Sequence, residues 1–149
     1  DREMKIVTEL EDDILETESE LRECFKALSS LDCILSFADC ASDLGFTRPR
    51  LVDDDSASLQ SQQQQKRHSQ VIYIKDGRHP LQEIICERDF VSNDVQIDDV
   101  DRILCVSGSN YSGKSCYLRQ VGLLVYMAHI GSFIPCSQAV ISVTDQIFA

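Results

Sequence analysis

A glycine-rich octapeptide contains the residues of this chain that are best suited to chemistry, Gly108-Ser109-Asn110-Tyr111-Ser112-Gly113-Lys114-Ser115. Its spacing fits the pattern G-x-x-x-x-G-K-[ST], in which glycines free the backbone so that successive N–H groups can surround an anion. In that pattern Lys114 would reach the β- and γ-phosphates, and the hydroxyl of Ser115 would bind Mg²⁺. The octapeptide therefore predicts a nucleotide phosphate site, with a glycine-rich surface turn as the alternative.

The segments on either side of this loop predict the elements that position it. The apolar run 102–107 predicts a strand, the run 116–129 predicts a helix that ends near Gly131, and residues 139–143 predict a second strand. One face of the helix is apolar and would pack on a parallel sheet: Leu118, Val121, Leu124, Val125 and Ala128. The order strand, loop, helix, strand predicts the start of an α/β sheet.

Carboxylates are scarce beyond the loop. Nucleotide hydrolysis needs an Asp that helps to hold Mg²⁺ and, in many enzymes, a Glu that activates water. After Ser115 the sequence contains one carboxylate, Asp145, and no Glu. Asp145 is therefore a weak catalytic candidate, and we expect the chain to bind a nucleotide but to hydrolyse it poorly, if at all.

The amino-terminal part has the pattern of a long helix from Ile6 to about Ala38. Its narrow seam alternates steps of four and three and has a polar defect at Thr17: Leu10, Ile14, Thr17, Leu21, Cys24, Leu28, Leu31, Leu35 and Ala38. A coiled coil and an ordinary amphipathic helix packed on its own domain both fit this pattern. Residues 28–38 are apolar on several faces and are expected to be buried, and Gly45 and Pro49 would end the helix.

The middle of the chain changes character twice. Residues 53–70 are acidic, then rich in Ser and Gln, then basic, which predicts a solvated linker or insertion. Residues 71–74 predict a strand that leads to a turn at 76–80, in which His79 is expected to be a structural hydrogen-bonding residue. The acidic stretch 94–101 is expected to be a loop.

Composition narrows the class of protein. A formal net charge of −11 over 149 residues argues against direct binding of this segment to a nucleic-acid backbone. The seven cysteines form no C-x-x-C pair and no zinc-like spacing, which favours a reducing compartment. No signal peptide is visible, and the longest apolar run is too short and interrupted to span a membrane. The ends of the sequence suggest a piece of a larger protein.

Several motifs, in a consistent order, resemble the nucleotide-binding domain of the MutS family of DNA mismatch proteins. They are the loop 108–115, Tyr117-Leu118-Arg119-Gln120, residues 130–135 and 145–148, the lead-in Gly77-Arg78-His79-Pro80 with 90–93, and residues 31–38 with Arg48-Pro49. The resemblance implies an ABC-type P-loop sheet preceded by a long lever-like helix. It divides the chain into the end of the lever (1–50), a low-complexity linker (51–70) and the first part of an ATPase domain (71–149).

The resemblance also implies roles for single residues. Phe90 would stack on the adenine of ATP, with Val91 and Asn93 beside it, and Ser115 would hold Mg²⁺. The phosphates would lie against Gly108, Asn110, Tyr111, Ser112, Gly113, Lys114, Ser115 and Cys116. Ser109 and Cys116 depart from the usual family residues without removing backbone N–H donors. The Asp-Glu strand, the signature loop and the dimerisation helices of the family would lie beyond Ala149.

Within the family the motifs look most like the meiotic branch, represented by the fifth eukaryotic homologue. That likeness implies DNA binding through other domains, a heterodimer with another MutS homologue (the fourth is expected), work on recombination intermediates or mismatches, and a nuclear location. The alternative is a truncated, catalytically inactive product that binds a nucleotide or a partner helix. An unrelated P-loop protein, such as a small kinase or GTPase, is a third interpretation, but neither a base-selective motif nor a substrate lid is visible.

Overall fold

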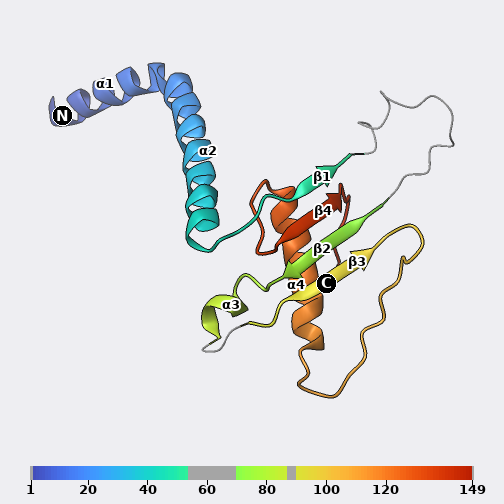
Figure 1. The fold of residues 1–149 in the computed structure, drawn as a ribbon. Coiled ribbons are helices and arrows are strands. Elements are labelled where there is room, and N and C mark those ends of the chain that lie inside the picture. Colours follow the sequence, from blue (N-terminus) through green and yellow to red (C-terminus); the bar gives the residue numbers. More distant parts are fainter. Residues whose placement is uncertain (1, 54–69, 87–89, 149) are drawn as a thin grey trace, which may run out of the picture. The chain divides into compact units, whose positions relative to one another are not determined.

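A computed structural model describes residues 2–53, 70–86 and 90–148 of the chain (Figure 1). The contacts divide it into two compact units, Asp1–Phe37 and Ala38–Ala149. Most of the expected linker lies outside the described residues. No helix within the described ranges is long and apolar enough to cross a membrane.

The amino-terminal unit contains an interrupted helix in place of the expected continuous one. Helix α1 covers Arg2–Glu16, and helix α2 covers Glu18–Asp43. At Thr17 both the backbone N–H and the side-chain hydroxyl donate to the carbonyl of Ile14, at 3.1 and 3.0 Å. Such a side-chain bond competes with the regular helical ladder. The polar defect in the seam is therefore also the place where the expectation of a single helix is wrong.

The apolar seam of these helices is exposed. None of the described residues of α1 or α2 is buried, and Leu28 and Leu35 expose 64% and 52% of their surface. Residues 28–38 were expected to be buried, but none of the described residues of α2 is buried, so that expectation is wrong for this structure. Helix α2 ends as predicted near Gly45, which has φ +62°, and the N–H of Phe46 reaches back to the carbonyl of Ala41.

The carboxyl-terminal unit is built on a four-stranded mixed sheet with strand order β1-β4-β2-β3 (Figure 1). Its strands are β1 (Arg50–Val52), β2 (Ile72–Gly77), β3 (Asn93–Ile97) and β4 (Gln138–Ser142). Strand β1 is parallel to β4, whereas β2 is antiparallel to both β4 and β3. A short helix α3 (Gln82–Ile85) follows β2, and helix α4 (Lys114–His129) precedes β4.

The structure confirms part of the expected order. Strands β2 and β4 and helix α4 lie where the sequence places them, and the chain is mixed α/β. Strand β3 occupies part of the stretch 94–101 that was expected to be a loop. Its side chains alternate, with Val95 buried between the exposed Asp94 and Gln96. The strand was not predicted because only one of its faces is buried and the other is polar.

The expected strand at residues 102–107 is absent from the described structure. These residues have no regular secondary structure, and Ile103 exposes 84% of its surface. A strand needs a neighbour for its backbone groups, and both sides of β4 are already occupied, by β1 and by β2. The expected parallel sheet directly before the glycine-rich loop is therefore not observed, and an ABC-type P-loop sheet stays a prediction.

Helix α4 covers one face of the sheet (Figure 1). The core joins its inner face to alternate residues of three strands and to the segment before β4: Ile74, Val95, Leu124, Val125, Ala128, Ile134, Cys136, Ala139 and Ile141. Leu118 departs from the expected buried face and is 58% exposed. The helix ends as predicted, because Gly131 has φ +86° and its N–H bonds to the carbonyl of Ala128.

Leu→Ala substitutions at two positions of helix α4 distinguish the contribution of side-chain burial from that of helix propensity. Leu124 is fully buried, so Leu124→Ala is expected to lower the free energy of unfolding by about 2–5 kcal/mol through lost contacts and the cavity that remains. Leu118→Ala makes the same chemical change at an exposed position and is expected to cost well under about 1 kcal/mol. Urea denaturation followed by circular dichroism measures both, and equal losses would contradict the described packing.

The core also protects one thiol. Burial raises the pKa of Cys136 from 9.0 to about 11, and the residue is only 2% exposed, whereas Cys24 is exposed. Because the thiolate is the reactive form, iodoacetamide at pH 8 is expected to alkylate Cys24 in the folded chain and Cys136 only after denaturation. Peptide mass spectrometry measures both sites in one sample. Alkylation of both residues at the same rate in the folded chain would show that this core is not formed.

Candidate functional site

The glycine-rich loop runs directly into the first turn of α4. Gly113 stands at the start of the helix with φ +90°, a conformation that side chains with a Cβ rarely adopt, and its carbonyl accepts the N–H of Tyr117 at 2.9 Å. At Gly108 a Cβ would lie 3.0 Å from Oγ of Ser112, so the loop closes tightly there. The loop and the free N–H groups of the helix start form a concave backbone surface of the kind that binds anions.

Lys114 holds the interior of this loop. Its Nζ donates to the carbonyl of Gly108 at 2.7 Å and also to the carbonyl of Ser109. The ammonium group therefore bridges the two ends of the loop and places one positive charge inside it. A phosphate group that entered the loop would meet this charge directly.

A cavity of about 930 Å³ opens beside the loop. The loop contributes Gly108, Ser109, Ser112, Gly113 and Lys114 to its wall, and Cys116 follows from the helix. The opposite wall contains Phe90, Val91 and Asn93. The structure thus brings most of the expected phosphate residues and all three expected adenine residues to one cavity, although they are far apart in the sequence.

Strand β3 positions the part of the cavity wall that residues 90–93 form. Asn93 begins this strand, pairs with Gly77 of β2, and donates from Nδ2 to the carbonyl of Val91 at 3.1 Å. A β-bulge lies between Ile74 and Gly77, where Asp76 adopts φ +51° and donates its N–H to Oδ1 of Asp94 at 2.8 Å. These contacts determine where the segment 90–93 leaves the sheet.

The turn after β2 is built from its own polar groups. Arg78 and Glu83 form a half-buried ion pair with Nε and Oε1 2.6 Å apart. Nδ1 of His79 accepts the N–H of Gln82 at 3.3 Å, and the carbonyl of His79 accepts the N–H of Glu83 at 3.0 Å. His79 is 5% exposed, so the prediction of a structural role for it is confirmed.

The first turns of α4 are tied to this turn and to β3. Sγ of Cys116 lies 3.2 Å from Oε1 of Gln82, and burial, followed by the neighbouring Cys86, raises the pKa of the Cys116 thiol. The hydroxyl of Tyr117 donates to the carbonyl of Asp94 at 3.0 Å, and burial, followed by the nearby Asp94 charge, raises the pKa of Tyr117. Both side chains line the cavity as neutral groups at physiological pH.

Gln120 is a buried residue of this cavity that the site prediction missed. It is fully buried, and its Nε2 donates to the carbonyl of Gly77 at 2.9 Å. Gln82, Asp94 and Tyr117 also line the cavity without having been predicted. The sequence did contain one signal for Gln120, because a polar residue stands between Tyr117 and Leu124 on the inward face of an otherwise apolar helix side.

Four expected site residues lie elsewhere. Asn110 and Tyr111 are exposed and do not line the cavity, and Tyr111 has φ +62°. Ser115 lines a different hollow of about 570 Å³ together with apolar residues, and Asp145 is exposed after β4. The described residues contain no group of three or more His, Cys, Asp or Glu that could hold a metal ion.

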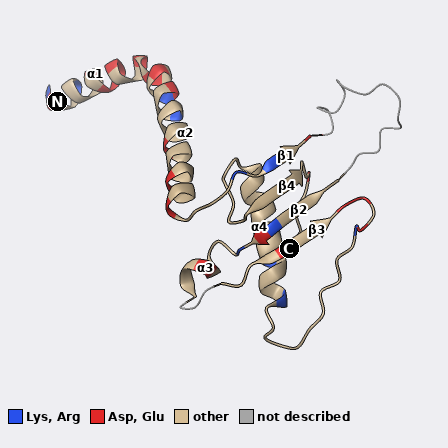
Figure 2. Ribbon diagram, viewed as in Figure 1, with Lys and Arg blue, Asp and Glu red and all other residues tan. Residues whose placement is uncertain are grey.

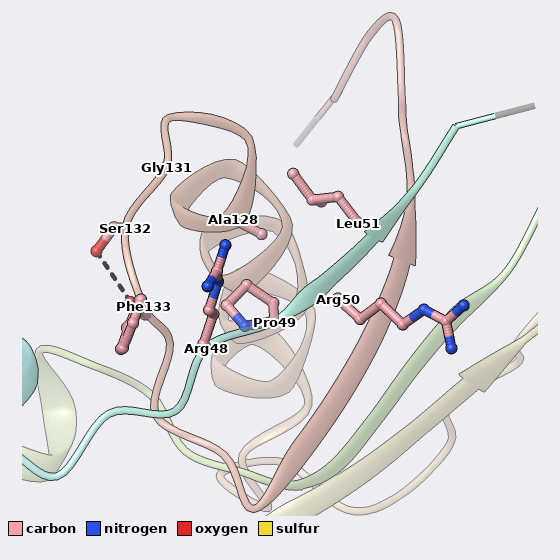
Figure 3. Close-up of a pocket in the computed structure, with 8 residues that line it drawn as sticks. All are labelled: Arg48, Pro49, Arg50, Leu51, Ala128, Gly131, Ser132 and Phe133. Atoms are coloured by element: carbon pink, nitrogen blue, oxygen red, sulfur yellow. Dashed lines mark hydrogen bonds between the residues drawn. The ribbon is translucent and has the colours of Figure 1, made fainter. Parts of the chain in front are cut away.

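A separate hollow of about 520 Å³ lies between β1 and the end of α4 (Figure 3). Arg48 and Arg50 line it, but their side chains point in different directions and their guanidinium groups do not converge. Ser132 donates from its hydroxyl to the carbonyl of Phe133 at 2.9 Å, which leaves that hydroxyl proton engaged. This arrangement does not resemble an anion site, and it contains none of the residues expected to have a function.

Acidic residues are frequent in three parts of the described chain. They gather on α1, on α2 and in the loop that follows β3 (Figure 2). In that loop Asp98 accepts the N–H groups of Asp101 and Val100, and these bonds lower its pKa. The glycine-rich loop itself contains no carboxylate, so the charge of Lys114 is not neutralised by a residue of its own loop.

Fold and site together define a mixed α/β chain with a glycine-rich, lysine-containing loop at the start of a helix and beside a large cavity. Residues 104–149 match the family model "MutS domain V". The chain is 38% identical over 129 residues to the DNA mismatch repair protein MutS of Prochlorococcus marinus (strain NATL1A), which covers 86% of this chain and 13% of that protein. It is 33% identical over 147 residues to the MutS protein of Staphylococcus carnosus (strain TM300), covering 98% of this chain and 15% of that protein.

These similarities support the resemblance to the MutS family that the sequence motifs indicated. A third relative, the MutS protein of Protochlamydia amoebophila, is 38% identical over 128 residues. The chain spans 13 to 15% of the length of these relatives. The relatives named are bacterial mismatch repair proteins, and they do not distinguish the meiotic branch.

Two glycines of this region predict opposite effects of the same substitution. Gly113→Ala forces a Cβ into a left-handed conformation and is expected to lower the free energy of unfolding by about 1–2 kcal/mol. Gly122 lies inside α4, where an added Cβ would meet Ile147 at an ordinary 3.9 Å, so Gly122→Ala is expected to stabilise the chain by about 0.5–1 kcal/mol. Thermal denaturation compares the two variants, and a shift of the same sign in both would contradict the described start of α4.

Proposed function

We propose that this chain is the ATP-binding segment of a MutS-like DNA mismatch-binding or recombination-intermediate-binding ATPase. The observation that carries the proposal is the single cavity that joins the glycine-rich loop to the segment 90–93. The loop supplies backbone N–H groups and the Lys114 ammonium for phosphates. Phe90 supplies an aromatic ring for stacking on the base, and Val91 and Asn93 lie beside it.

The residues of the cavity perform binding and orientation in this proposal. Lys114 exchanges its contacts with the loop carbonyls for contacts with the β- and γ-phosphates, while Gly113 and the start of α4 present N–H donors. Mg²⁺ accompanies ATP mainly through the phosphate oxygens, with Ser115 as its nearest expected protein ligand. Asp94 is the carboxylate among the described residues of the cavity wall, and its Oδ1 accepts the N–H of Asp76. We assign no catalytic step to this chain, and Asp145 stays a weak candidate.

The role of the whole protein follows from the family as a proposal. DNA mismatch repair is the activity named for the bacterial relatives. We propose that DNA binds through other domains of the intact protein, in agreement with the acidic charge of this chain, and that another MutS homologue forms a heterodimer with it. Three segments resemble the meiotic branch: residues 77–83, the pair Tyr111-Ser112, and Gln120-Val121-Gly122-Leu123. This resemblance favours the fourth homologue as partner and a nuclear location.

A second candidate function is a catalytically inactive polypeptide that binds a nucleotide or a partner helix. The exposed apolar seam of α1 and α2 favours it, because exposed apolar side chains that recur along one helix face are suited to pairing with another helix. The two candidates differ in whether nucleotide turnover accompanies binding. A phosphate-release assay on the intact protein, with and without mismatched DNA, distinguishes them.

Removal of the loop cation tests nucleotide binding. Lys114→Ala removes the charge that faces the phosphates and is expected to weaken Mg-ATP binding by about 10- to 100-fold, since a charge-assisted contact to phosphate is worth about 1.5–3 kcal/mol. Lys75→Ala is the matched control, because Lys75 is exposed on β2 and lies outside the cavity wall. Isothermal titration calorimetry with Mg-ATP measures all three proteins.

The control separates a local effect from a general one. Unchanged affinity in Lys114→Ala, or an equal loss in Lys75→Ala, would contradict the phosphate site. Circular dichroism of both variants verifies that the fold is retained before affinities are compared.

A further inference from the structure

We propose that Gln120 determines the base preference of this site: its Oε1 accepts a hydrogen bond from the exocyclic amine of adenine. The inference rests on the proposed function, because it assumes that a nucleotide occupies the cavity. It adds a residue and an atomic contact for base selection that neither the motif in the sequence nor the family match assigns.

The two polar atoms of the Gln120 amide are in different situations. Nε2 donates to the carbonyl of Gly77 at 2.9 Å, which fixes the orientation of the amide, since a flipped amide would place two acceptors together. Oε1 is buried and has no hydrogen-bond partner among the described residues. A buried acceptor without a partner costs free energy, and such atoms in folded proteins call for an explanation by a ligand, a water molecule or an ion.

Gln120 lies at the base end of the cavity. A Cβ on Gly77 would stand 3.1 Å from Nε2 of Gln120 and 3.1 Å from the carbonyl oxygen of Asn93, so these two residues meet at Gly77. Asn93 belongs to the segment expected to contact adenine, and Lys114 lies two helical turns before Gln120, at the phosphate end. Gln120 is among the residues that line the cavity, so its amide borders the space assigned to the base.

Three other polar side chains of this wall each have one hydrogen-bonded atom. Nδ2 of Asn93 donates to Val91, the hydroxyl of Tyr117 donates to Asp94, and Oε1 of Gln82 accepts the thiol of Cys116. Oε1 of Gln120 is a buried acceptor of this wall that has no hydrogen-bond partner among the described residues. Adenine presents an N–H donor at its exocyclic position 6, where guanine presents a carbonyl oxygen. An acceptor at this position stabilises adenine and repels guanine, and a site built to accept such a bond rejects an analogue that lacks the donor.

The contact is tested by changing ligand and protein together. Purine riboside triphosphate is ATP without the exocyclic amine, so the ratio of its Kd to that of ATP isolates that amine. We expect the wild-type chain to bind ATP about three- to tenfold more tightly than this analogue, the range of one net hydrogen bond, and to bind GTP more weakly still. In Gln120→Met, which retains the length of the side chain without its amide, the ratio is expected to fall to about one.

Gln82→Met is the matched control, because it makes the same substitution on the same cavity wall at a residue whose oxygen already has a partner. It should retain the wild-type ratio. A wild-type ratio near one, or a wild-type ratio retained in Gln120→Met, overturns the role of Gln120 while nucleotide binding stands, and the first of these needs no variant to fold. Absence of binding by all three nucleotides overturns the proposed function and, with it, this inference.

Discussion

The packing of helix α4 on one face of the sheet is the constraint on which the other features depend. Burial of Leu124, Val125 and Ala128 against the strands fixes the rotation of the helix about its axis. The same rotation places Gln120 under the carbonyl of Gly77 and sets the start of the helix, with the glycine-rich loop, beside the segment that leaves β3. The geometry of the cavity is therefore a consequence of apolar packing two to four turns away from the loop.

The sequence predicted those parts of the molecule whose pattern is local. The octapeptide at 108–115 and the apolar runs of α4, β2 and β4 depend on neighbours within a few residues. Helix α4 and strands β2 and β4 form where the sequence predicts them, although Leu118 of the predicted apolar face is exposed. Phe90 and Asn93 line the same cavity as the loop. Their place near the loop was predicted from the family resemblance and not from a local sequence pattern. Their roles in binding stay predictions.

The remainder depends on contacts that a linear pattern does not contain. The run 102–107 has the composition of a strand, but a strand also needs backbone partners, and this run pairs with no strand of the described sheet. Strand β3 was concealed because Asp94 and Gln96 face outward, and its existence depends on pairing with β2. The interruption at Thr17 likewise depends on a single side-chain hydrogen bond to Ile14 and not on periodicity. The oxygen of Gln120 that has no partner among the described residues is also not visible in a sequence pattern.

One small feature has a mechanical consequence. Thr47 and Ile134 exchange two backbone hydrogen bonds, of 2.8 and 3.0 Å, and β1 then joins β4 only a few residues later. The segment after α2 is thus fastened to the turn that follows α4, which is the end of that helix remote from the glycine-rich loop. A force applied along the chain after Asp43 would act first on these backbone hydrogen bonds and on β4. It would reach the glycine-rich loop last, through helix α4.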